Sequence, residues 1–158
     1  MKKLLLTTIA GMLIMGLSTM KAQVRPTYQL TSTAVDKIME AALQYAQLNH
    51  APGGSIAIVD AGGHLLHFHR IDGTFPSSAQ VAIDKATTAA LFKADTQKFE
   101  DTVNGGREAL ITVGYNFLKG GIPIIYKGEI IGAIGVSGAA SADQDSEIAK
   151  AGSKAEIL

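Results

Sequence analysis

Three of the four histidines in the chain lie within one short segment. His64, His67 and His69 fall in residues 64–71, where apolar and polar side chains are mixed in a way that predicts a β-strand. Side chains two positions apart point to the same side of a strand, so His67 and His69 can bracket one transition-metal ion. A solvated or subunit-facing strand surface that binds nothing is the alternative, because no third ligand has a known position.

Cationic side chains and a pair of glycines form a second set of candidates. Arg70 directly follows the histidines, and Lys85 lies in an alanine-rich segment whose small side chains leave room for a flat ligand. A cation beside a pocket can pair with a ligand carboxylate. A salt bridge or an exposed helix position accounts for Lys85 equally well. Gly120 and Gly121 either present backbone N–H groups to an anion or form a turn.

Signs of catalytic chemistry are few. The chain has no Cys nucleophile, and we find no phosphate-binding loop, dinucleotide fingerprint, nucleophile elbow or His-Glu-x-x-His motif. Acid–base chemistry by Asp84, Lys85 or a histidine stays open, because a lysine in a closed pocket can have a lowered pKa. The acidic residues Asp143, Asp145 and Glu147 are spaced for the start of a helix and do not match an EF-hand loop.

Alternating helical and strand patterns must position these residues. The turn between the last two predicted strands carries Lys127-Gly128, a pair typical of tight hairpins. Residues 109–113 fit either a short strand or a helix. We predict an α+β domain with helices packed on an antiparallel sheet. The expected strands are 55–60, 64–71, 122–126 and 130–137, and the expected helices begin near 31–33, 77–78, 95 and 143.

Two glycines interrupt the last predicted strand. Gly132 and Gly135 lie in an otherwise apolar run, and glycine weakens a strand unless something approaches its backbone closely. Close packing of a helix, or a bulge, is the favoured interpretation. The alternative is a ligand that lies against the bare backbone.

The first residues predict export. Lys2 and Lys3 precede an apolar run and a small-residue region, the order of a secretory signal peptide, which we place at residues 1–22 with a single domain at 23–158. Cleavage there leaves 11 basic and 14 acidic residues. A mildly acidic chain without a basic cluster argues against binding to nucleic acid or to anionic membranes. The absence of Cys excludes disulfides and a lipoprotein anchor.

Several motifs together resemble the GlcG/HbpS family of small haem-binding and related proteins. The same pattern is similar to a domain appended to some corrinoid adenosyltransferases. The matching motifs are Ile-Val-Asp-Ala-Gly-Gly-His-Leu at 58–65, Arg-Ile-Asp-Gly at 70–73, Ala-Ile-Asp-Lys-Ala at 82–86 with Thr-Ala-Ala at 88–90, Gly-Gly-Ile-Pro-Ile at 120–124, Ile-Gly-Ala-Ile-Gly-Val-Ser-Gly at 131–138, and Asp145 with Ile-Ala-Lys-Ala-Gly at 148–152.

The resemblance implies a profilin-like fold with a five-stranded antiparallel sheet, and a homo-oligomer. It implies a small-molecule ligand, best known as haem in secreted members, with a histidine commonly found at the position of His64. His67 and His69 depart from that pattern, so they are candidates for an axial or metal ligand particular to this chain.

We therefore expect a periplasmic or extracellular protein that binds haem or a related tetrapyrrole for capture, storage or sensing, without a stable membrane anchor. A small-molecule enzyme, such as a lyase or isomerase acting on an organic acid through Lys85, is the second hypothesis. A structural or partner-binding subunit is the third.

Overall fold

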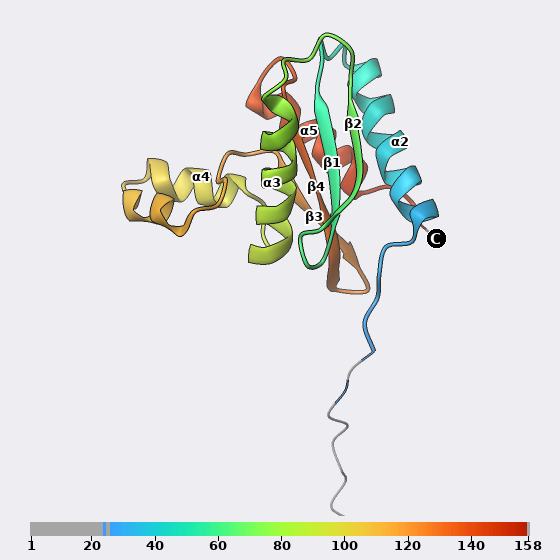
Figure 1. Ribbon diagram of the computed structural model, residues 1–158, viewed down its shortest axis with the longest axis horizontal. Coiled ribbons are helices and arrows are strands. Elements are labelled where there is room, and N and C mark those ends of the chain that lie inside the picture. The colour runs from blue at the N-terminus through green and yellow to red at the C-terminus, as the bar shows by residue number, and fades with distance from the viewer. Residues whose placement is uncertain (1–23, 25, 158) are drawn as a thin grey trace, which may run out of the picture.

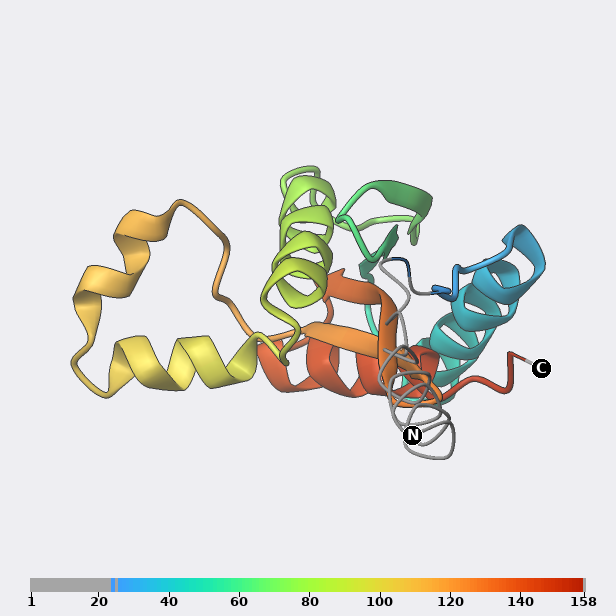
Figure 2. The same cartoon turned by 90° about the horizontal axis from the view of Figure 1, so that it is seen from below.

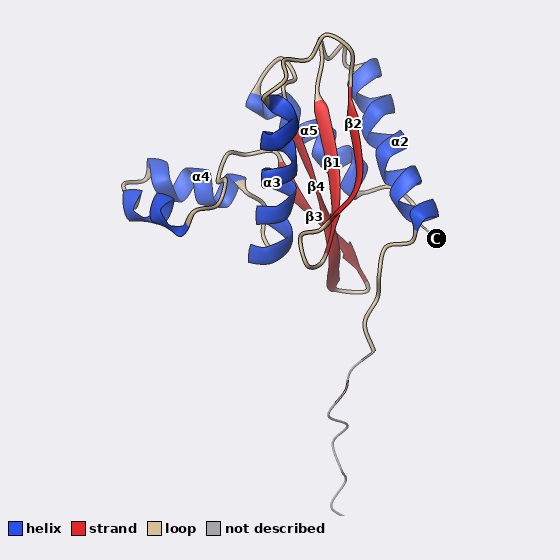
Figure 3. Ribbon diagram, viewed as in Figure 1, coloured by secondary structure: helices blue, strands red, loops and turns tan. Residues whose placement is uncertain are grey.

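Four strands and the helices around them make up the fold (Figure 1). The computed structural model describes residue 24 and residues 26–157, so the predicted signal peptide at 1–22 lies outside the described residues. Figure 3 separates helices from strands by colour. The elements are α2 (Ser32–Leu48), β1 (Ser55–Asp60), β2 (Leu65–Arg70), α3 (Ser78–Phe92), α4 (Gln97–Asn104), the 3₁₀ helix η1 (Glu108–Val113), β3 (Gly121–Tyr126), β4 (Glu129–Ser137) and α5 (Ala142–Ser153).

The sheet is antiparallel throughout and has the strand order β2-β1-β4-β3. Both predicted hairpins are present. The tight turn between β3 and β4 uses Lys127 and Gly128 with φ angles of 47° and 80°, as a two-residue hairpin turn requires. The α+β class is therefore confirmed. Among the described residues, none of the helices combines the length and apolarity needed to cross a membrane.

The count of five strands is wrong, because the sheet has four. Residues 109–113, which fitted a strand or a helix, lie in η1 instead of adding an edge strand. Gly106 and Gly114, with φ angles of 100° and 80°, bound this segment, and it forms local bonds such as Leu110 N–H to Arg107 O at 3.1 Å. The sheet ends at β3, which carries Pro123, a residue suited to edge strands because it lacks an N–H.

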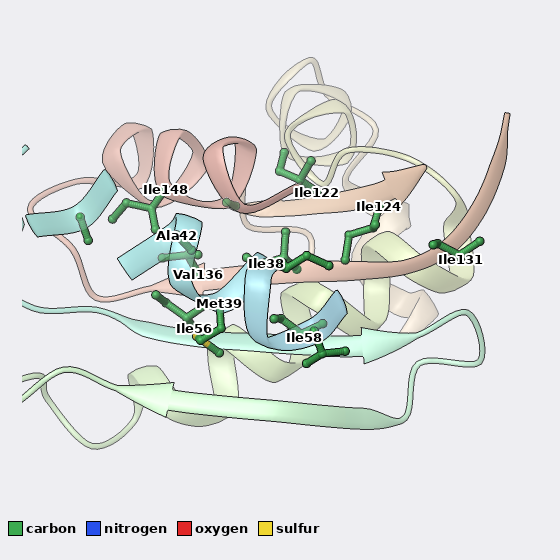
Figure 4. Packing of buried hydrophobic residues seen from close by; sticks show 14 residues of the cluster. Ile38, Met39, Ala42, Ile56, Ile58, Ile122, Ile124, Ile131, Val136 and Ile148 are labelled. Atoms are coloured by element: carbon green, nitrogen blue, oxygen red, sulfur yellow. The ribbon is translucent and has the colours of Figure 1, made fainter. Parts of the chain in front are cut away.

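Helices cover both faces of the sheet: α2 and α5 pack on one face and α3 on the other (Figure 2). The α2/α5 face holds the larger side chains. Ile56 and Ile58 of β1 meet Ile38 of α2 there, with Ile148 of α5 in the same cluster (Figure 4). Burial of branched side chains of this kind is the main stabilising term of such a core.

The α3 face is built from small residues, which allow the helix to approach the strands closely. A Cβ placed on Gly135 would contact the backbone O of Ala82 and lie 2.5 Å from the backbone N of Ala86. Gly132 is packed closely by other elements: a Cβ there would contact the backbone O of Val59 of β1 and lie 2.6 Å from Cδ1 of Leu30, which packs against the α2/α5 core. Close packing therefore explains both glycines, and protein atoms occupy the space beside them.

Side-chain caps set the starts of two helices. Thr31 Oγ1 accepts a hydrogen bond from Ala34 N–H at 3.2 Å at the start of α2, and Ser141 Oγ accepts one from Gln144 N–H at 3.1 Å at the start of α5. Asp143 and Asp145 lie in the first turn of α5, where negative charge is favourable. The prediction that these acidic residues begin a helix is confirmed.

Candidate functional site

The histidines of the second strand separate as strand alternation predicts. His67 and His69 pair with Ile58 and Ile56, whose side chains belong to the core on the α2/α5 face. Cross-strand partners point to the same side of a sheet, so both histidines face the α2 side. His64 precedes β2 and belongs to the β1–β2 turn.

His67 lies beside an open groove between α2 and β2, of about 480 Å³. Its Nδ1 is 3.5 Å from Asp36 Oδ1 of α2, and Glu40 also lines the groove. His69 is exposed. Among the described residues no three His, Cys, Asp or Glu side chains are grouped so that they could hold a metal ion. The assignment of His67 and His69 as a metal pair stays a prediction.

The β1–β2 turn places His64 against Asp60, a residue that the sequence analysis did not single out. Asp60 Oδ1 accepts hydrogen bonds from the N–H groups of Gly62 at 2.8 Å and His64 at 2.9 Å. Both carboxylate oxygens also lie 3.2 Å from His64 Nδ1. Thr87 of α3 fixes the turn from the other side, because its hydroxyl donates to Gly63 O at 3.1 Å.

These contacts give the His64 ring a defined chemistry. Burial raises the pKa of Asp60. The hydrogen bonds from the His64 and Gly62 backbones, together with the His64 ring, lower this pKa by more than burial raises it, so the net shift is downward. An anionic carboxylate beside Nδ1 favours the proton on that nitrogen and leaves the lone pair on Nε2. The His64 side chain is 82% exposed. Its Nε2 is therefore available to a Lewis acid, in the carboxylate–histidine arrangement common at metal sites.

An open cleft of about 760 Å³ adjoins this turn. His64 is not among the residues that line the cleft, but its ring lies next to the lining residue Gly62, where a Cβ would fall 2.9 Å from His64 Nδ1. Lys93, which ends α3 in the left-handed conformation with φ 54°, adds a cation to the lining. The lining residues are Pro26–Leu30, Asp60–Gly62, Leu66, Lys93 and Gly128–Ile131.

Lys85, Gly120 and Gly121 come together elsewhere, in the protein interior. Lys85 is 2% exposed, and its Nζ donates to Val136 O at 2.9 Å and to Asp145 Oδ2 at 3.0 Å. Gly120 lies against this ion pair, because a Cβ there would be 3.0 Å from Lys85 Nζ. A Cβ on Gly121 would contact the backbone O of Lys85. Protein atoms thus occupy the positions that a ligand would need at Lys85.

Arg70 lies apart from both groups. It is exposed and ends β2 opposite Ser55, whereas His64 precedes the first residue of the same strand. The structure therefore does not bring Arg70 beside His64. A ligand role for Arg70, as for Lys85 and the glycines, stays untested.

Comparison with known proteins identifies the family. Residues 30–154 match the family model described as "Haem degrading protein HbpS-like". The chain belongs to this HbpS-like family. Protein GlcG of Escherichia coli K12 is 42% identical over 119 residues, which are 75% of this chain and 85% of GlcG. The family assignment made from the sequence motifs is thus confirmed.

Solved structures of HbpS-like proteins share the fold. An HbpS variant of Streptomyces reticuli superposes with a TM-score of 0.74 at 33% identity, covering 84% of this chain and 90% of that one. The structure described as a PduOC:heme complex superposes with a TM-score of 0.70 at 28% identity, covering 79% and 93%. One structural relative is therefore described with haem bound.

Proposed function

We propose that this HbpS-like protein binds haem or a related metallated tetrapyrrole in the cleft beside the β1–β2 turn, with His64 Nε2 as the axial ligand. The observation that carries the proposal is the Asp60 carboxylate 3.2 Å from His64 Nδ1. Histidine is the usual protein ligand of haem iron, and a carboxylate on the opposite ring nitrogen fixes its tautomer and raises its basicity. The family description and the PduOC:heme complex support haem as the ligand class.

The shape and lining of the cleft support the same ligand. Its volume of about 760 Å³ falls within the roughly 300–1,000 Å³ of small-molecule pockets. Leu66, Ile131 and Tyr28 supply apolar surface for a flat macrocycle, and Lys93 supplies a cation for a propionate. The groove at His67 is a weaker candidate, because Asp36 and Glu40 line it without a lysine or arginine, whereas the cleft lining holds Lys93 beside its own carboxylates, Asp60 and Glu129.

The enzyme hypothesis based on Lys85 receives less support from the geometry. A lysine that acts as an acid, a base or a carboxylate clamp must reach its substrate, whereas the Lys85 ammonium is enclosed and bound to Asp145. Haem capture, storage or sensing by a binding protein is therefore the function that we propose.

The test is a haem titration of the purified protein followed by absorbance, with single-site variants. We expect a saturable Soret band for the wild type and at least a tenfold weaker affinity for His64→Ala. His69→Ala is the matched control, because this exposed histidine lies on the same hairpin and contacts no carboxylate among the residues that the structure describes. A flat titration of the wild type would overturn haem binding. An unchanged affinity in His64→Ala, or a loss in His67→Ala instead, would overturn the site.

We also propose that the protein acts outside the cytoplasm, on the basis of the signal-peptide pattern at residues 1–22. Mass spectrometry of the protein made in its native cell, after osmotic release of the periplasm and collection of the medium, tests this location. We expect a chain that lacks roughly these residues in one of those fractions. A full-length chain retained with the cytoplasm would contradict it.

A further inference from the structure

Residues 26–30, which we call the strap, lie just before α2 and pass beside the β3–β4 hairpin (Figure 1). All five of them line the cleft at the β1–β2 turn, and they belong to no helix or strand. Among the described residues, no backbone hydrogen bond involves an N–H or C=O group of the strap. Side-chain contacts therefore hold this wall of the cleft in place.

The other walls of the cleft are fixed by backbone hydrogen bonds. In the β1–β2 turn, Asp60 N–H donates to His64 O at 2.9 Å. Residues 128–131 belong to the hairpin of β3 and β4, and Lys93 donates its N–H to the last turn of α3. Movement of any of these walls would break backbone hydrogen bonds, whereas the strap can move without breaking one.

The end of the strap nearest α2 is anchored. Leu30 packs against the α2/α5 core, and a Cβ on Gly132 would lie 2.6 Å from Leu30 Cδ1. Thr31, the next residue, caps α2 with its side chain. The chain before the strap is open to solvent at Val24, which is 82% exposed. A segment that is fixed at one end in this way can pivot at its anchor, here Leu30.

Tyr28 holds the middle of the strap against the β3–β4 hairpin. Its ring meets the Tyr126 ring edge-on at a centroid distance of 4.9 Å. The Lys127 ammonium lies 5.4 Å from the centroid of the Tyr28 ring and 5.2 Å from that of Tyr126. A cation–π contact contributes little at an exposed site, and Tyr28 is 43% exposed. The strap can therefore leave this resting position readily.

We propose that the strap closes over the ligand in the cleft, and that Tyr28 exchanges the Tyr126 ring for the face of the macrocycle. This inference rests on the proposed function, because it concerns the ligand of the same cleft. A ligand shifts a conformational equilibrium only if it binds one conformation better. A flat aromatic macrocycle meets this condition, since it offers the Tyr28 ring a larger aromatic surface than Tyr126 does. Closure shields the bond to His64 from water and slows release of the ligand.

Transfer of haem from the loaded protein to excess apomyoglobin, followed by stopped-flow absorbance, tests the strap. We expect Tyr28→Ala to release haem about tenfold faster or more, with the association rate changed by less than about threefold. Tyr28→Phe keeps the ring and should release haem at the wild-type rate. Tyr115→Ala is the matched control, because Tyr115 is 42% exposed and does not line the cleft. It should also leave the release rate unchanged.

Spin labels follow the position of the strap directly. The chain has no native Cys, so Thr27→Cys and Leu91→Cys in one protein place one label on the strap and one on α3. Gallium protoporphyrin, which is diamagnetic, is the added ligand. We expect the distribution of distances between the labels to become shorter and narrower when it binds. An unchanged distribution would overturn closure of the strap.

The outcomes separate the strap from the proposed function. A wild type that gives no Soret band with haem overturns both, because the strap then has no ligand to cover. A wild type that binds haem, while Tyr28→Ala releases it at the wild-type rate, overturns the strap alone. Equally fast release from Tyr28→Phe and Tyr28→Ala would overturn the contact between the Tyr28 ring and the macrocycle.

Discussion

Two side-chain pairs with a carboxylate involve candidates that the sequence placed at a ligand site, and the fold buries one pair and leaves the other exposed. Lys85 and Asp145 form a 3.0 Å pair whose side chains are 3% and 7% exposed. His64 and Asp60 form a 3.2 Å pair whose side chains are 82% and 40% exposed. In the first pair, the Lys85 ammonium binds only protein groups, Val136 O and the Asp145 carboxylate, among the described residues. The second keeps one ring nitrogen available to a ligand.

The difference lies in what surrounds each pair. Lys85 connects α3 to Val136 of β4 and Asp145 of α5, and Asp145 Oδ1 accepts a further bond from Ala139 N–H at 3.0 Å. A buried charge is tolerated only with such partners. Asp60 instead organises a surface turn around His64. A charged residue type alone therefore does not indicate a ligand site, because burial and partners decide its role.

The largest effect is expected from breaking the buried pair. Lys85→Met should lower the free energy of unfolding by about 3–5 kcal/mol, because it leaves the Asp145 carboxylate buried without its cation. Urea unfolding followed by circular dichroism measures the loss. The exposed Lys93→Met is the matched control and should change stability by less than about 0.5 kcal/mol. A similar small loss in Lys85→Met would show that Lys85 is not structural.

The next effect concerns Gly135 of β4, which lies directly against the backbone of α3. Gly135→Ala should destabilise the fold by about 1–3 kcal/mol, because the added methyl group meets helix backbone that cannot move aside. Gly105→Ala, at a position whose φ of −75° suits alanine, serves as the control in the same unfolding experiment. If Gly135→Ala is as stable as the wild type, α3 is free to shift, and a ligand could use that space.

Asp60→Asn, a change in the exposed pair of Asp60 and His64, should affect ligand affinity more than the stability of the fold. The amide oxygen of Asp60→Asn can still accept from the Gly62 and His64 backbones, but the negative charge beside Nδ1 is lost. We expect haem affinity to fall about 10–100-fold, as for other carboxylates that orient a metal-binding histidine, with little change in melting temperature. Affinity equal to the wild type would mean that Asp60 does not support the His64 ring.

The smallest effect is a pH dependence. The folded-state pKa of Asp60 lies below its usual value of 3.8, so the ionised carboxylate stabilises the fold above that value and this contribution is lost as the pH falls through the folded pKa. The stability difference between the wild type and Asp60→Asn should therefore shrink as the pH is lowered below 3.8. It should stay under about 1 kcal/mol, because the pair is largely exposed. A difference that grows in acid would contradict this assignment.

The sequence allowed much of the fold to be predicted, because hairpins and caps depend on local residue types. Lys127-Gly128 forms the expected hairpin turn, and α2 begins at the expected residues 31–33. The prediction of a fifth strand failed because residues 109–113, although apolar, form the local hydrogen bonds of a 3₁₀ helix and do not pair with either edge of the sheet. The apolar composition of residues 109–113 suits a helix as well as a strand, so composition alone does not distinguish the two.

The site was less predictable, because its residues meet through turns and helix ends. His64 was found through the family resemblance, whereas Asp60 and Lys93 were missed. An Asp two residues before Gly62 and four before His64 is a pattern for an Asx turn, and it offered a signal for the Asp60–His64 contact. Lys85 and Asp145 are 60 positions apart, so no local pattern could show that they form an ion pair.

The most direct test of the central claim, that the open pair binds the ligand and the buried pair does not, is nitrogen NMR on the ¹⁵N-labelled protein. Gallium protoporphyrin is the probe, because it resembles haem and is diamagnetic. We predict that the Nε2 signal of His64 moves strongly on binding, while the Nζ signal of Lys85 and the ring signals of His67 and His69 stay in place. Movement at Lys85, His67 or His69 with an unmoved His64 would contradict the account.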